Sequence, residues 1–140
     1  MTDLIISGIS NALDSEFEGV KIYAEQQKQG FEGPCFFVSC INPTHELFRG
    51  KRYFRKNQFA IYYFPESDLE PKQECNAVAE RMYDCLEYII VQDSLTRGTN
   101  MSYTVNDGVM TFLVNYDMFV YKKEDTTAMG ELSNNITAKG

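Results

Sequence analysis

The residue types that could act as nucleophiles or metal ligands are few in this sequence. It contains four cysteines and one histidine, which are Cys35, Cys40, Cys75, Cys85 and His45. A zinc site needs clustered thiolates or imidazoles, yet no two cysteines form a Cys-x-x-Cys pair and His45 has no neighbour at ligand spacing. Free cysteines usually behave as small hydrophobic residues. We therefore expect buried free thiols, no metal site and no cofactor.

An active site built on these residues would pair His45 with Cys40, the thiol nearest to it in sequence. Nucleophilic catalysis needs a cysteine or serine beside a histidine that a carboxylate holds in place. Neighbours on one strand seldom reach that arrangement, and a histidine after Asn42-Pro43 fits an exposed loop better. No glycine-rich phosphate loop is present, because Gly30 and Gly33 lack its strand and helix context. The sequence predicts no enzyme, and a small Cys40–His45 enzyme is the alternative.

The densest charge cluster of the chain holds five cations within eight residues. They are Arg49, Lys51, Arg52, Arg55 and Lys56, with Tyr53 and Phe54 between them. The whole chain carries a net charge of −7, so the other residues sum to −12. Three interpretations stay open: a solvated strand face, a contact with an acidic protein surface such as a neighbouring subunit, or a nucleic-acid patch.

Two further stretches are candidates for polar protein contacts. Asn115 and Asp117 lie on the side of a strongly patterned strand that also carries Thr111, and this side either meets solvent or contacts another subunit. The second stretch is the polar tail that starts at Lys122 and Lys123. By composition, residues 123–140 cannot form a core of their own.

The totals describe one ordinary globular domain. Of the 140 residues, 44% are hydrophobic and 24% are charged, which is typical of soluble domains of this size. No apolar run is long enough to cross a bilayer, and the N-terminus lacks a basic region followed by an apolar segment. We therefore expect a cytoplasmic, unprocessed chain. The net negative charge argues against nonspecific binding to nucleic acid or to an anionic membrane.

The stretch Thr99–Val120 predicts a β-hairpin. Apolar residues recur at every second position on both sides of Asp107-Gly108, and Asp-Gly is a strong signal for a tight turn. The second strand spans about a dozen residues, and one face carries six side chains: Met110, Phe112, Val114, Tyr116, Met118 and Val120.

Periodicity and turn signals predict the remaining elements. In chain order they are a helix over Thr2–Leu13, a strand over Val20–Glu25, a loop over Gln26–Gly33, a strand over Pro34–Ile41 covered on both faces, two strands within His45–Phe64 separated near Lys56-Asn57, a linker over Pro65–Pro71, a helix over Lys72–Ile90, and a connection over Val91–Gly98 with a short strand near Leu95-Thr96. In the first helix, Gly8 costs about 1 kcal/mol relative to alanine.

Runs of neighbouring strands with only two helices indicate an α+β fold. We expect a mixed, mostly antiparallel sheet with both main helices packed on one face. A single domain is expected over residues 1–122, followed by a polar tail over residues 123–140.

Five segments, taken in order, resemble tail terminator proteins of prophages and phage-tail-like particles. They are LIISGISNAL, EGPCFFVSCINP, RGKRYFRKNQFAIYYFP, AVAERMYDCLEYI and DGVMTFLVNYDMFV. The resemblance spans about Met1 to Lys122. It implies a small α+β fold that assembles as a hexameric ring on the head-proximal end of the tail tube.

The resemblance also implies a function and partners. The ring would end polymerisation of the tube, and of the sheath where one is present, and would offer a surface to the head–tail connector. The genome would pass through the ring without specific recognition. The protein would be found in the host cytoplasm during assembly and then in the tail of the virion or particle. A head-completion, connector or tube protein, and a small nucleic-acid-binding module, remain as alternatives.

Overall fold

The computed structural model describes residues 2–24, 34–66 and 69–121, and these residues fall into two compact units. The described part of the first unit covers residues 2–24, 34–44, 56–66 and 69–117. The described part of the second unit covers residues 45–55 and 118–121. The predicted loop over Gln26–Gly33 and the tail from Lys122 onward lie outside the described residues.

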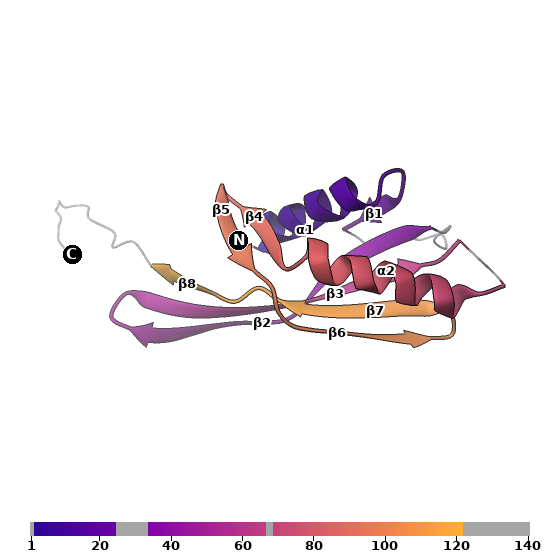
Figure 1. Cartoon of the computed structure of the whole chain (residues 1–140). Coiled ribbons are helices and arrows are strands. Elements are labelled where there is room, and N and C mark those ends of the chain that lie inside the picture. The colour runs from indigo at the N-terminus through magenta and orange to yellow at the C-terminus, as the bar shows by residue number, and fades with distance from the viewer. Residues whose placement is uncertain (1, 25–33, 67–68, 122–140) are drawn as a thin grey trace. The chain divides into compact units, whose positions relative to one another are not determined.

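Two helices and eight strands make up the described chain (Figure 1). In order they are α1 (Thr2–Glu16), β1 (Lys21–Tyr23), β2 (Cys35–Arg49), β3 (Arg52–Phe64), α2 (Pro71–Cys85), β4 (Tyr88–Val91), β5 (Ser94–Arg97), β6 (Thr99–Asn106), β7 (Val109–Asn115) and β8 (Met118–Tyr121). No helix among the described residues is long and apolar enough to cross a membrane.

The main sheet has the strand order β1-β2-β3-β7-β6, and β8 pairs separately with β3. β1 runs parallel to β2, whereas the pairs β3–β7, β6–β7 and β3–β8 are antiparallel. β4 and β5 form a separate two-stranded antiparallel sheet. Two helices with a mixed, mostly antiparallel sheet confirm the predicted α+β class.

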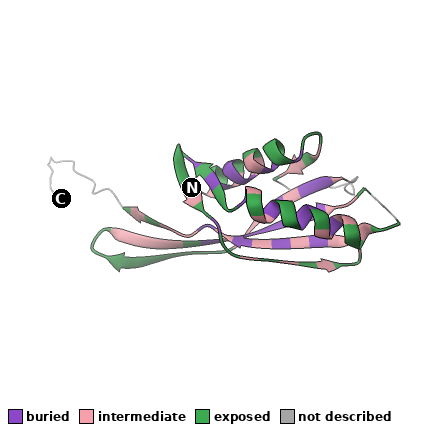
Figure 2. Ribbon diagram, viewed as in Figure 1, coloured by how far each residue is buried: buried purple, intermediate pink, exposed green. Residues whose placement is uncertain are grey.

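Every buried hydrophobic side chain of the described residues belongs to the first unit. α1 presents Ile5, Ile9 and Leu13 at four-residue spacing, and all three are fully buried. α2 packs against β6 and β7, while α1 contacts β1, β4 and α2. In Figures 1 and 2 the helices lie on one side of the sheet of the first unit and turn their buried residues toward it.

Gly8 allows the close approach of α1 to β4. A Cβ atom at this position would lie 2.7 Å from the carbonyl oxygen of Ile90, a contact that real Cβ atoms do not make. The helix therefore keeps a residue of poor helix propensity because the neighbouring backbone occupies the space of a side chain.

The predicted helix over Lys72–Ile90 is too long. α2 ends at Cys85, and the backbone N–H of Leu86 donates to the carbonyl of Met82 at 2.9 Å as the helix closes. The stretch Tyr88–Val91 then forms β4, as its β-branched residues favour. Ile89 is buried as predicted, but it belongs to a strand.

The predicted boundaries between Pro34 and Phe64 are also wrong. β2 continues past Asn42-Pro43 to Arg49, with Asn42 in the left-handed region at φ +48°. The chain reverses at Gly50, whose φ of +57° is one that glycine adopts without strain. β3 then runs without a break through Lys56-Asn57, where the separation was expected.

The predicted hairpin forms, with Asp107 and Gly108 at φ +52° and +76° in the turn between β6 and β7. The predicted dozen-residue strand, however, is interrupted at Tyr116-Asp117, so β7 ends at Asn115 and β8 begins at Met118. Pairing along β3 has the same register on both sides of the interruption, as Gln58↔Asn115 and Arg55↔Met118 show.

The two short predicted strands are present. The strand expected over Val20–Glu25 is β1, and the one expected near Leu95-Thr96 is β5.

Candidate functional site

Among its described residues, 45–55 and 118–121, the second unit has none of the buried side chains that normally stabilise a sheet. It comprises the last residues of β2, the turn at Gly50, the first residues of β3, and β8. None of its described residues is buried, and Figure 2 shows only intermediate and exposed colours there. Four of its large apolar side chains are exposed, by 62% for Leu47, 58% for Phe48, 42% for Phe119 and 73% for Tyr121. Because a small sheet needs a covered apolar face, this exposure makes the unit a candidate binding surface.

One group of side chains in the second unit consists of three aromatic rings and an arginine. The ring of Phe119 lies 5.1 Å from that of Phe48 and 4.9 Å from that of Phe54, measured between centroids. The guanidinium carbon of Arg52 lies 4.1 Å from the Phe119 centroid and 5.5 Å from the Phe48 centroid. Such cation–π contacts hold a charge on an apolar surface. Arg52 is therefore fixed above the aromatic cluster.

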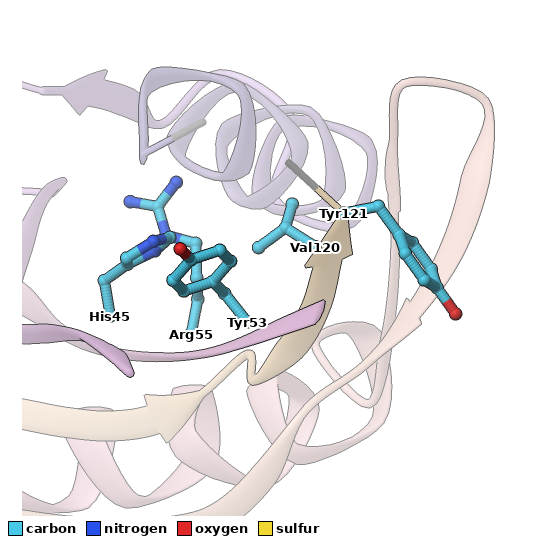
Figure 3. A pocket seen from close by; sticks show the side chains of 5 residues that line it. All are labelled: His45, Tyr53, Arg55, Val120 and Tyr121. Carbon is cyan, nitrogen blue, oxygen red and sulfur yellow. The ribbon is translucent and has the colours of Figure 1, made fainter. Parts of the chain in front are cut away.

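A second group surrounds an open hollow of about 420 Å³ in the same unit, lined by His45, Tyr53, Arg55, Val120 and Tyr121. The His45 and Tyr53 rings are stacked, 4.5 Å apart with an interplanar angle of 17°. Figure 3 shows the guanidinium of Arg55 beside His45, while the Tyr121 ring turns away from the group. The Nε atom of Arg55 is buried and has no hydrogen-bond partner in the structure. The hollow thus combines aromatic walls with a cation, which suits an anionic side chain.

The structure separates the predicted contact residues into two sets. Arg49, Lys51, Arg52 and Arg55 all belong to the second unit, where Arg49 and Lys51 are exposed at the turn. The other three described candidates, which are Lys56, Asn115 and Asp117, belong to the first unit. Lys122 and Lys123 lie outside the described residues.

Asp117 has a partner within its own chain. Its Oδ1 accepts a hydrogen bond from the backbone N–H of Asn57 at 3.2 Å. The side-chain amide of Asn57 donates to the carbonyl of Tyr116 at 3.0 Å, and the N–H of Tyr116 donates to the carbonyl of Asn57 at 2.8 Å. Asn57 is fully buried. These bonds stabilise the interruption between β7 and β8, so Asp117 acts first as a structural residue.

Asn115 is the last residue of β7 and lies between two strands. It pairs with Gln58 on β3 and with Thr99 on β6. Its side-chain Oδ1 is buried without a hydrogen-bond partner in the structure.

Sequence reasoning missed the apolar half of the surface. Leu47, Phe48, Phe119 and Tyr121 are hydrophobic residues in strand patterns, and such residues are normally assigned to a core. For Leu47 and Phe48 the available signal was their position immediately before Arg49, whereas no arginine lies beside Phe119 or Tyr121 in the sequence.

The described residues hold no group of three histidine, cysteine, aspartate or glutamate side chains that could bind a metal ion. None of the four cysteines, all of which the structure describes, forms a disulfide bond; Cys35 and Cys75 are buried, and Cys40 and Cys85 are half-buried. Burial raises the pKa of Cys35 and of Cys75. Burial, together with the nearby Glu16 carboxylate, raises the pKa of Cys85 to about 12. These three thiols therefore stay protonated and poorly nucleophilic near neutral pH.

Three comparisons with known proteins bear on identity. No curated protein matches the chain. One solved structure without a functional name aligns with 89% of this chain and 98% of its own chain, at 12% identity and a TM-score of 0.44. A likeness this weak supports no statement about fold or function. The model of the phage tail terminator protein family, in contrast, matches residues 4–128. The chain therefore belongs to the phage tail terminator family, whose members are structural proteins of the phage tail.

Proposed function

We propose that this protein closes the head-proximal end of the tail tube as a ring, expected by analogy to be hexameric. The ring ends polymerisation of the tube, and of the sheath where one is present, and offers an attachment surface to the head–tail connector. It assembles in the host cytoplasm, remains in the tail of the virion or tail-like particle, and carries out no catalysis. The match to the tail terminator family over residues 4–128 carries this proposal.

The second unit supports a role in assembly. A ring subunit must bind a neighbour on each side, and it must also bind the tube. The second unit exposes large apolar side chains next to arginines, and arginine and aromatic residues are enriched in the centres of protein interfaces. We assign Arg49, Lys51, Arg52 and Arg55 to a subunit or tube contact.

The remaining predicted contacts have less structural support. Lys56 is exposed on β3, and Lys122 and Lys123 begin the tail; we propose them as auxiliary contacts of the same assembly. Asn115 and Asp117 would contribute by fixing the end of β7, where Asp117 accepts its hydrogen bond.

Particles produced without this protein provide the test. We expect their tubes to vary widely in length and to exceed the normal length, because nothing stops subunit addition. Supplying the wild-type protein in trans restores a single length and places it at the head-proximal end, which electron microscopy of labelled particles can locate. Tubes of normal length and intact head attachment in its absence would refute the proposal.

A further inference from the structure

Large exposed apolar side chains gather at two places in this protein. Among the described residues, nine such side chains are exposed, and seven of them fall in two small sets. The first set, called here the basic face, consists of Leu47, Phe48, Phe119 and Tyr121 in the second unit. The second set, called here the hairpin face, consists of Tyr88, Ile90 and Leu95 on β4 and β5 in the first unit.

The hairpin face follows from the alternation of side chains along β4. Ile89 and Val91 are buried, at 2% and 5% exposure, so Tyr88 and Ile90 point to the opposite side. Ile90 is paired with Leu95 on β5, and the two are exposed by 64% and 69%. An open hollow of about 360 Å³ adjoins Ile90. Its lining consists of Tyr88, Ile89 and Ile90 together with Gly8, Asn11, Ala12 and Ser15 of α1. Nothing in the described chain covers this apolar side.

The two faces lie in surroundings of opposite charge. The described residues of the second unit carry Arg49, Lys51, Arg52 and Arg55 against the single acid Glu46. Around the hairpin face, α1 carries Asp3, Asp14 and Glu16 and no lysine or arginine, and Glu16 is paired with Arg81 of α2 at 2.9 Å. Residues 84–97 add three further acids, Asp84, Glu87 and Asp93, and the only cation within this stretch is Arg97.

We propose that the basic face of one copy binds the hairpin face of a second copy. Apolar side chains would meet at the centre of the contact, and the arginines of one copy would meet the acids of the next at its rim. Pairing two basic faces would instead bring like charges together. Because the two faces differ, each copy uses both, and the contact is heterologous, which is the kind that closes into rings. The inference rests on the proposed function, since it names the surfaces by which the terminator subunits would assemble.

The test uses three single variants of the full chain. Phe48→Asp changes the basic face, Ile90→Asp changes the hairpin face, and Leu69→Asp is the matched control, because Leu69 is 93% exposed and lies outside both faces. All three positions are exposed, so each variant should retain the thermal midpoint of the wild-type monomer. Mass photometry and sedimentation velocity measure assembly, both alone and with tail tubes from particles that lack the protein.

We expect the wild type and Leu69→Asp to assemble alike, and each face variant to need at least a tenfold higher concentration. A mixture of Phe48→Asp and Ile90→Asp should form a one-to-one dimer that grows no further, because one intact basic face remains to bind one intact hairpin face. An isologous contact predicts a different result, in which one face variant dimerises alone.

Assembly of Ile90→Asp at the wild-type concentration, or no dimer in the mixture, would overturn the inference. A wild-type chain that stays monomeric both alone and on tubes would overturn it as well. Failure of the proposed function looks different: the wild type would form rings through these faces, yet tube length would not depend on the protein.

Discussion

The hydroxyl of Tyr116 gives the sharpest test of how this fold is stabilised. It donates a hydrogen bond of 2.6 Å to the carbonyl of Leu86, the residue that follows the end of α2. Both residues are fully buried. The Tyr116 ring also packs near Phe59, with centroids 6.2 Å apart. Replacing Tyr116 by phenylalanine keeps the ring and removes only the donor, so the change isolates this one bond.

The expected loss of stability in Tyr116→Phe follows from leaving the buried Leu86 carbonyl without its hydrogen-bond donor. A buried acceptor left without a donor costs about 1–3 kcal/mol, more than the net value of an average hydrogen bond. No water replaces the donor unless the packing opens. For a domain of this size, 1 kcal/mol corresponds to about 4 °C, so the thermal midpoint should fall by about 4–12 °C.

Tyr103→Phe is the matched control. The Tyr103 hydroxyl donates to the side-chain oxygen of Asn76 at 3.0 Å, and both residues are only half-buried, so water can take its place. We expect a loss of about 0.5 kcal/mol or less in this variant. Urea unfolding followed by circular dichroism measures both. A Tyr116→Phe loss no larger than that of Tyr103→Phe would refute the reasoning, because burial of the acceptor would then not matter.

Two further predictions concern a close backbone contact and alkaline pH. Gly8→Ala should destabilise the fold by about 1–2 kcal/mol despite alanine's higher helix propensity, because the new Cβ would meet the Ile90 carbonyl at 2.7 Å. The exposed control Ser7→Ala should change the free energy of unfolding by less than about 0.5 kcal/mol. A Gly8→Ala variant more stable than the wild type would contradict the close approach of α1 to β4. The folded state raises the pKa of Cys85 above the ordinary thiol value of 9.0 to about 12. The contribution of this thiol to the free energy of unfolding should therefore be constant below about pH 9 and decrease above it, where the unfolded chain releases the proton first. The difference between the urea midpoints at pH 8 and pH 10 measures the effect, and Cys85→Ala should reduce this difference. An equal difference in the wild type and in Cys85→Ala would exclude this thiol as a cause.

The sequence predicted those elements whose signals are local. The turn at Asp107-Gly108 requires only that two successive residues tolerate positive φ, and the pattern of β7 requires only one buried face. The end of α2 was harder to predict, because Leu86 and Ile89 are three residues apart and satisfy the spacing of a helix. Both are buried, but the chain has already entered β4 at Ile89.

Boundaries that depend on distant residues were not predictable. Asn57 is typical of turns, yet it lies inside β3 because the carbonyl of Tyr116, 59 positions away, accepts its side-chain amide. The turn forms instead at Gly50. The same limit applies to the candidate binding surface: the sequence revealed the arginines, but only the fold shows that Arg52 lies over Phe119 and that none of the described residues of the second unit is buried.

The exposure of every described residue of the second unit, at least in part, has a consequence for how its backbone exchanges hydrogen with solvent. The protection of an amide against exchange increases exponentially with the free energy of the opening that exposes it, and a segment without buried apolar contacts opens at little cost. In free subunits, the amides of residues 45–55 and 118–121 should therefore take up deuterium early, while those of β7, with its buried Met110, Phe112 and Val114, take it up late. The proposed contact with a neighbouring subunit would cover these residues of the second unit, and their amides should then exchange slowly as well. Deuterium uptake in these two stretches, measured against β7 in the same molecule, would report the time at which each subunit joins an assembly.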